Sequence, residues 1–199
     1  MKRRTFDILV SAGGLLLVAV LAVAGGLLTW GSNYITNQVH NQLAAQQIYF
    51  PSKAAFAHPK AGTEITPSMI PSVSKYAGQQ LTNGTQAAAY ANHFIAVHLQ
   101  EIGGGKTYSQ LSTEAMAQPN NTALANQVAT VFKGTTLRSM LLNAYAYGTM
   151  GRIAGDAATI CFIGAGALLI ISGLGLAHSR RVPPSAEVLD HQHRQTVTA

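Results

Sequence analysis

"ILVSAGGLLLVAVLAVAGGLLTW", residues 8–30, decides the fold, because this stretch contains no charged residue. A helix of this length rises about 34 Å, which is enough to cross a hydrocarbon core of roughly 30 Å. A second uncharged stretch, "AATICFIGAGALLIISGLGLA", occupies residues 157–177. Only 10% of the 199 residues are charged, far below the roughly 25% of a typical soluble domain. These features predict an all-α membrane protein with two transmembrane helices, at residues 8–30 and 154–177.

The first apolar stretch has an alternative interpretation as a cleaved signal peptide. Lys2, Arg3 and Arg4 resemble a positively charged n-region, and "AVAGG" around Ala22 resembles a small-residue cleavage site. The apolar run is longer than the about 7–15 residues of a typical h-region, and "LLTW" continues it beyond the candidate cleavage site. We therefore predict an uncleaved anchor, with cleavage as the alternative.

The positive charges beside the two spans predict their orientation. Lys2, Arg3 and Arg4 precede the first span, and Arg180 and Arg181 follow the second. Lys and Arg next to a span favour the cytoplasm. The chain is thus predicted to be a multi-pass protein of the plasma membrane, with the lipid bilayer as a partner. Both termini are expected in the cytoplasm, as a short N-terminus (1–7) and a disordered tail (178–199).

Residues 31–153 are predicted to form a small, mostly helical extracytoplasmic domain. Helical spacing of apolar residues predicts helices at 32–49, 85–102, 109–117 and 122–133, and another from residue 136 onward. Gly134 is expected to stop or bend the chain, and Gly148 and Gly151 to kink the last helix. Four prolines between residues 50 and 75 predict an extended Pro-rich strap over the rest of the domain. A short helical turn after Thr66 and Pro67 is the alternative for that part of the strap, because proline suits the first helical position.

The stretch "GGGKT", residues 103–107, resembles the end of a phosphate-binding loop. That motif needs glycine five positions before its Gly-Lys-Ser/Thr, where this chain has Gln100. A phosphate-binding loop also follows a strand, whereas this one follows a predicted helix. We therefore predict no nucleotide as a partner and a structural turn in which at least one glycine has a positive φ.

His93, His98 and Glu101 are the candidate ligands for a metal ion. Two histidines and one carboxylate form a known kind of metal site. His98 and Glu101 are neighbours on a helix, but His93 and His98 lie well over 100° apart on a regular α-helix. The main prediction is therefore that no residue of the chain binds a metal or other cofactor, that His98 packs in the core, and that His93 and Glu101 face water.

Other chemistry has little support in the sequence. The net charge of +6 comes largely from the span flanks, and no cluster of basic and aromatic residues in the middle segment predicts nucleic-acid binding. Carboxylates are few there, and we predict no catalytic residue. Within the spans, Ala22 and Gly26, and Ala157, Cys161 and Ala165, have the small-residue spacing that lets helices approach closely in lipid.

Two longer stretches carry a resemblance to a known group. They are "YAGQQLTNGTQAAAYANHFIAVHLQEIGGGKTYSQLS" and "VFKGTTLRSMLLNAYAYGTMGRIA". They resemble a group of uncharacterised two-span membrane proteins of actinobacteria, over most of residues 78–154 and, by position, both spans. The resemblance implies the two-span topology and a bacterial plasma membrane. Some members are labelled as ring-opening dioxygenases, a chemistry that needs an open metal site, and no catalytic residue is transferred from them.

The functional hypothesis follows from these predictions. We expect a membrane-anchored, non-enzymatic protein whose extracytoplasmic helical domain mediates protein–protein assembly, with a second copy or another membrane protein as its partner. The alternative is an extracytoplasmic metal-binding protein or enzyme that uses His93, His98 and Glu101.

Overall fold

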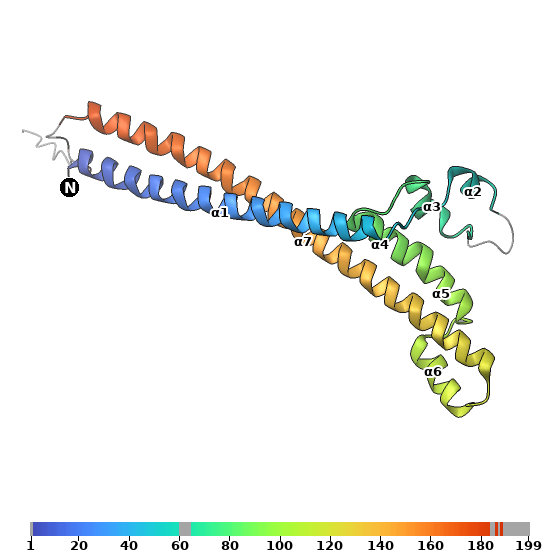
Figure 1. Cartoon of the computed structure of the whole chain (residues 1–199). Coiled ribbons are helices and arrows are strands. Elements are labelled where there is room, and N and C mark those ends of the chain that lie inside the picture. Colours follow the sequence, from blue (N-terminus) through green and yellow to red (C-terminus); the bar gives the residue numbers. More distant parts are fainter. Residues whose placement is uncertain (1, 60–64, 184–185, 187, 189–199) are drawn as a thin grey trace, which may run out of the picture. The chain divides into compact units, whose positions relative to one another are not determined.

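The computed structural model describes residues 2–59, 65–183, 186 and 188, and within them it is helical without a strand. The all-α prediction is thus confirmed for these residues. The chain divides into two compact units: unit 1 comprises the described residues of Met1–Gly31 and Ala154–Ala199, and unit 2 is Ser32–Ile153. The elements in chain order are α1 (Arg3–Ala45), α2 (Lys53–Ala57), α3 (Ile70–Val73), the 3-10 turn η1 (Ser74–Tyr76), α4 (Gly84–Ala89), the π-helix η2 (Tyr90–Ile95), α5 (Ala96–Ile102), α6 (Tyr108–Ala117) and α7 (Thr122–Arg181) (Figure 1).

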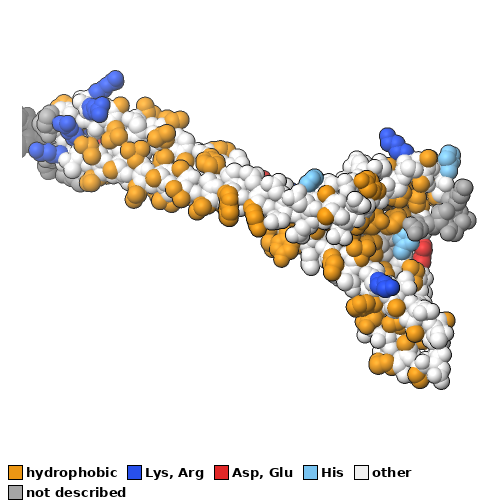
Figure 2. Space-filling view, viewed as in Figure 1, with side chains coloured by type: hydrophobic (Ala, Val, Ile, Leu, Met, Phe, Trp, Pro, Cys, Tyr) orange, Lys and Arg blue, Asp and Glu red, His pale blue; other side chains and the backbone are white. Residues whose placement is uncertain are grey.

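Helices α1 and α7 are each long and apolar enough to cross a membrane. In unit 1 their large hydrophobic side chains lie mostly on the outside, and Leu16, Leu27 and Ile163 are 68%, 64% and 67% exposed. Figure 2 shows hydrophobic side chains spread along the visible face of this unit. Exposed apolar surface of this extent is unfavourable in water and suits a hydrocarbon surrounding.

Small residues line the seam where the two helices of unit 1 pack together. On α1, Ser11 and Gly25 are buried, and on α7 Ala165 and Ser172 are buried. A Cβ on Gly14 would collide with the Ser172 hydroxyl. The helices therefore approach closely because the seam carries small side chains, which is the packing mode expected in lipid.

The predicted small-residue pair of the first span is not on this seam. Ala22 and Gly26 are exposed, and a Cβ on Gly26 would meet nothing within 4 Å. A Cβ on Gly25, by contrast, would lie 3.0 Å from the ring of Phe162. Neighbouring helical positions point about 100° apart, so the spacing rule chose the wrong glycine. The second predicted set fits the seam better, since Ala157 and Cys161 are half-buried and Ala165 is buried.

The core of unit 2 gathers side chains from the end of α1, the 48–81 segment, the helix from Gly84 to Ile102, and α7. Its most enclosed side chains are Met69, Val73 and Leu81, with no exposed surface. Ser32 Oγ donates a hydrogen bond of 2.7 Å to the carbonyl oxygen of Gly151 and so ties α1 to α7 within this unit. The other buried apolar members are Val39, Leu43, Phe50, Phe56, Ala87, Ala91, Phe94, Ile95 and Leu141.

The predicted extended strap contains short helices. Ser52 Oγ accepts a hydrogen bond from the Ala55 amide and caps α2, whose alanine-rich sequence lies between two prolines. Helix α3 begins at Ile70, with Pro71 in its first turn, where the missing N–H costs nothing. An extended conformation is therefore wrong at α2, whereas α3 agrees with the alternative of a short helical turn after Thr66 and Pro67. Residues 60–64 lie outside the described chain.

Helix α7 runs without interruption from Thr122 to Arg181, so the predicted stop at Gly134 is wrong. A Cβ on Gly134 would lie 2.6 Å from Leu99 Cδ2. The glycine makes room for α5 on the surface of α7, so it acts in packing and does not end the helix. The helix also continues through Gly148 and Gly151. It includes residues 178–181 of the predicted disordered tail, while most of the remaining tail lies outside the described residues.

Candidate functional site

The continuous helical segment from Gly84 to Ile102 carries the candidate ligands. His98 is half-buried, and its Nδ1 lies 2.7 Å from the carbonyl oxygen of Phe94. Because a carbonyl can only accept, Nδ1 carries the proton and donates it. The ring of His98 packs on that of Phe94, with 4.6 Å between the centroids. His98 is thus a packed residue of unit 2, as predicted.

His93 and Glu101 are both exposed, and neither is gathered with His98. Throughout the described residues, no three His, Cys, Asp or Glu side chains are close enough together to hold a metal ion. The angle predicted between His93 and His98 assumed a regular α-helix, which does not apply here, because Tyr90–Ile95 is π-helical. The side chains still do not converge.

Aromatic rings form a continuous column beside this helix. Tyr76 packs on Phe50 at a centroid distance of 5.1 Å, and Phe50 meets the edge of Tyr90 at 5.4 Å. Tyr90 stacks on Phe94 at 4.7 Å, and Phe94 continues to His98. Each such pair adds roughly 0.5–1.5 kcal/mol beyond the burial of its area. The column therefore links the 48–81 segment to the helix that carries the histidines.

The π-helical turn is supported by an arginine from α7. Arg138 Nε donates a hydrogen bond of 3.2 Å to the carbonyl oxygen of Ala91, and its terminal nitrogen donates one of 3.0 Å to Asn92 Oδ1. The Ala91 carbonyl also accepts the amide of Ala96, the i to i+5 bond of a π-helix. Sequence reasoning missed Arg138, because its partner depends on a turn that no local pattern indicates.

Gln86 closes the start of α4, and the sequence around it contains a known signal for a helix start. Asn83 caps α4 by accepting the Gln86 amide at 2.9 Å, and Gln86 Oε1 accepts the Thr82 amide at 2.8 Å. Gln86 is only 5% exposed, and its amide nitrogen donates to Gln79 Oε1 at 3.0 Å. A capping residue followed three positions later by Gln or Glu is a known start signal.

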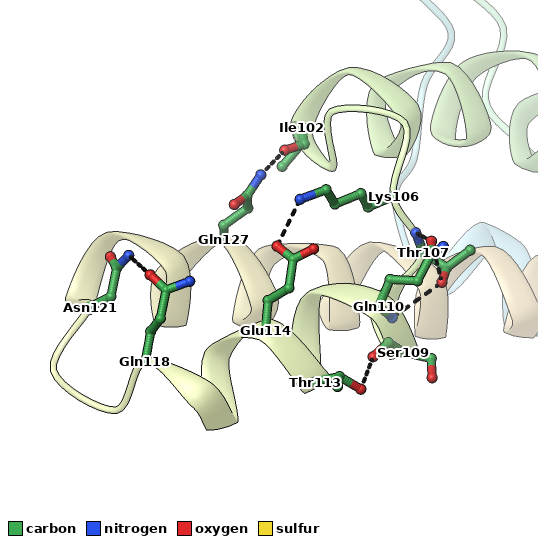
Figure 3. A network of polar contacts seen from close by, with 10 residues as sticks. All are labelled: Ile102, Lys106, Thr107, Ser109, Gln110, Thr113, Glu114, Gln118, Asn121 and Gln127. Carbon is green, nitrogen blue, oxygen red and sulfur yellow. Dashed lines mark hydrogen bonds and ion pairs between the residues drawn. The ribbon is translucent and has the colours of Figure 1, made fainter.

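The "GGGKT" segment forms a turn between α5 and α6. Gly104 and Gly105 have φ values of +58° and +79°, which confirms the predicted positive φ. Thr107 is the N-cap of α6 and forms a capping box with Gln110. Lys106 Nζ lies 2.7 Å from Glu114 Oε2, both being well exposed (Figure 3). The threonine of the motif-like stretch therefore serves as a cap.

Two of the depressions in unit 2 lie beside both α1 and α7 and differ in the side chains that line them. The first, which we call the polar cleft, has a volume of about 430 Å³ and is bordered by α1, the start of α4 and α7. The second, the apolar groove, has a volume of about 310 Å³ and runs between α1 and α7. Its lining includes Val39, Leu43, Leu141 and Ala144, with Gln42, Gln46 and Asn143 as polar members.

Comparisons with protein-family models, curated protein sequences and solved structures find no match for this chain. The resemblance to the actinobacterial group therefore stays a prediction.

Proposed function

We propose that this chain is a membrane-anchored, non-enzymatic assembly protein that associates with a second copy of itself through the outer face of α7. The observation that carries this function is an exposed, uncharged row on α7 beside the apolar groove. The row consists of Met140, Asn143, Tyr147 and Met150.

The row has the geometry of a helix-packing surface. Its members are spaced by three, four and three residues, which places them on one side of a helix. Met140, Tyr147 and Met150 are 63%, 58% and 57% exposed. Large apolar side chains in such a row are typical of surfaces that pack against another helix.

The chemistry of this surface suits a second copy in particular. A two-fold interface joins a patch to itself, so the patch must complement its own chemistry. Here the protruding side chains of Met140 and Tyr147 border the groove that could receive them from a partner. Gln42, Gln46 and Asn143 on the same surface carry both donors and acceptors, so each can pair with an identical amide. No like charges within the patch would oppose this pairing.

The two apolar helices and the basic residues that flank them support insertion in a membrane and a defined orientation. Both helices are inserted in the plasma membrane, with unit 2 on the outer side, because Lys2–Arg4 and Arg180–Arg181 retain both ends in the cytoplasm. Single cysteines at Ser109 and at Val188, in a Cys161→Ser background, test the orientation. An impermeant thiol reagent on intact cells is expected to label position 109 only, and labelling of position 188 alone contradicts the orientation.

Self-association is tested on the purified full chain in a mild detergent. The mass of the protein part, measured by light scattering, is expected to be that of a dimer or larger. Met140→Glu places a charge in the row and is expected to yield a monomer. Met116→Glu is the matched control, because Met116 is also a well-exposed methionine, at 74%, and lies on α6 outside the row. A monomeric wild type, or a dimer that survives Met140→Glu, contradicts self-assembly through α7.

A further inference from the structure

The polar cleft of unit 2 is held open by close backbone packing at its base. A Cβ on Gly84 would lie 3.1 Å from the carbonyl oxygen of Ala144 and from Tyr145 Cα. A Cβ on Gly148 would lie 3.4 Å from Gly84 Cα. The first turn of α4 therefore rests directly on the backbone of α7. The residues on either side of this contact line the cleft.

The lining of the cleft is rich in groups that both donate and accept hydrogen bonds. Hydroxyl and amide side chains come from three parts of the chain that are distant in sequence. They include Thr36, Thr82, Asn83, Thr85, Tyr145 and Thr149. A site lined in this way suits a ligand with several oxygen atoms.

The formal charge that the described residues of the lining carry is positive and favours an anion. Arg152 contributes a guanidinium and His40 an imidazole, and no carboxylate lies among the described residues that form the cleft. Arg152 donates one hydrogen bond of 3.2 Å, to Thr149 Oγ1, and has no carboxylate partner within the described part of unit 2. A guanidinium has five donor hydrogens, and its planar fork matches the oxygens of a phosphate. Most of the hydrogen-bonding capacity of Arg152 therefore stays available to a ligand.

The position of the lining along the two long helices points to the source of the phosphate. Thr36 lies six residues after Trp30, which is about 9 Å of helical rise. Arg152 lies two residues before the predicted second span. The polar headgroup layer extends roughly 5–8 Å beyond each side of the hydrocarbon core. With the spans inserted as in the proposed function, the Arg152 end of the cleft is at the depth of the outer headgroups, and Thr36 lies just beyond that layer.

We propose that the polar cleft binds the headgroup of an anionic glycerophospholipid, with Arg152 on the phosphodiester and the surrounding threonine and tyrosine hydroxyls on the free hydroxyls of the headgroup. This inference rests on the membrane insertion in the proposed function and is independent of self-association. A choline headgroup fits less well, because it places a cation beside Arg152 and offers no hydroxyl.

The test uses the full chain in a mild nonionic detergent and native mass spectrometry with short-chain lipids. Dihexanoyl phosphatidylglycerol is compared with dihexanoyl phosphatidylcholine and with soluble glycerol 3-phosphate. We expect phosphatidylglycerol to bind best. Arg152→Gln is expected to weaken its binding by about tenfold or more, as for the loss of a charge-assisted hydrogen bond. Lys106→Gln is the control, because it removes an exposed cation outside the cleft.

Three results would overturn the inference. One is equal binding of phosphatidylglycerol and phosphatidylcholine. Another is an equal loss in Arg152→Gln and Lys106→Gln, which would indicate attraction by net charge alone. The third is binding of glycerol 3-phosphate as tight as that of the lipid, which would indicate a soluble ligand. Thr149→Val tests the cleft without changing its charge, and circular dichroism verifies the fold of each variant. Lipid binding by a monomeric wild type would reject self-assembly while supporting the cleft.

Discussion

Arg138 Nε donates a hydrogen bond to the backbone carbonyl of Ala91, which lies 47 positions earlier in the chain. The bond joins α7 to the π-helical turn within the long helix of unit 2. A π-helix is less favourable than an α-helix and usually persists where a tertiary contact compensates for it. Arg138 supplies such a contact, because it binds both the Ala91 carbonyl and the Asn92 side chain.

Replacement of Arg138 by methionine tests this relationship. Methionine retains much of the apolar stem but has no donor. We expect Arg138→Met to lower the free energy of unfolding by about 1–2 kcal/mol, the range for a partly buried hydrogen bond from a charged group. Lys133→Met on the same helix removes an exposed cation and is expected to change it by less than about 0.5 kcal/mol. Thermal unfolding in a mild detergent measures both, and equal midpoints would argue against a supporting role for Arg138.

The turn between α5 and α6 yields a second prediction. Gly103 has a helical φ of −76°, but a Cβ there would lie 2.5 Å from the carbonyl oxygen of Lys106. Gly105 has φ of +79°, where an L-residue costs about 1–2 kcal/mol. Gly103→Val and Gly105→Val are therefore expected to destabilise the protein by at least about 1 kcal/mol each.

Lys106→Ala is the comparison for these glycine variants. Its ion pair with Glu114 is exposed, so its loss is expected to cost less than about 1 kcal/mol. A phosphate-binding loop would depend on this lysine. Binding of a nucleotide analogue by the wild type, lost in Lys106→Ala with the fold intact, would mean that the loop is a nucleotide site.

Local patterns in the sequence predicted several of the helices and where they begin. The apolar spacing around Ala87, Ala91 and Phe94 predicted a helix, and all three residues are buried. The start of α7 after Asn121 was also predictable, since Asn121 Oδ1 accepts the Leu124 amide at 3.0 Å. These features depend on residues within a few positions of each other, so the sequence itself carries the signal.

Features that depend on distant partners were not predictable. From the sequence alone, Gly134 indicates a helix stop, and only the structure shows that Leu99 packs against it. The π-helical turn depends on Arg138, and the choice of Gly25 over Gly26 for the seam depends on where α7 lies beside α1. The polar cleft brings together Thr36, Asn83 and Arg152, whose spacing contains no common motif.

The two adjacent glycines of the first span offer a matched pair of variants. A Cβ on Gly25 already approaches the Phe162 ring at 3.0 Å, so Gly25→Leu is expected to destabilise unit 1 by about 1–3 kcal/mol through overpacking. Gly26 is open on its outer side, so Gly26→Leu is expected to change stability by about 0.5 kcal/mol or less. Thermal unfolding of the two variants in the same detergent compares their stabilities. A lower stability for Gly26→Leu than for Gly25→Leu would place the helix seam on Gly26.

Two variants of His98 distinguish a packing role of this residue from a role as a metal ligand. His98→Ala removes the ring that packs on Phe94, and we expect a loss of about 1–2 kcal/mol, less than for a fully buried ring because His98 is half-buried. His98→Phe retains a ring in this position. It loses the bond from Nδ1 but also removes Nε2, which is enclosed without a hydrogen-bond partner among the described residues. The net change is expected to stay within about 1 kcal/mol, because these two effects oppose each other.

Elemental analysis of the same preparations completes this test. The wild type, purified without chelators, is expected to contain no divalent metal in stoichiometric amount. If His98 has a packing role, the His98→Phe variant is expected to be about as stable as the wild type, and the His98→Ala variant less stable than both. A metal ligand would produce a different order, since phenylalanine and alanine both lack a coordinating nitrogen. Stoichiometric metal in the wild type, lost equally in His98→Phe and His98→Ala, would make His98 a ligand and reject the packing role.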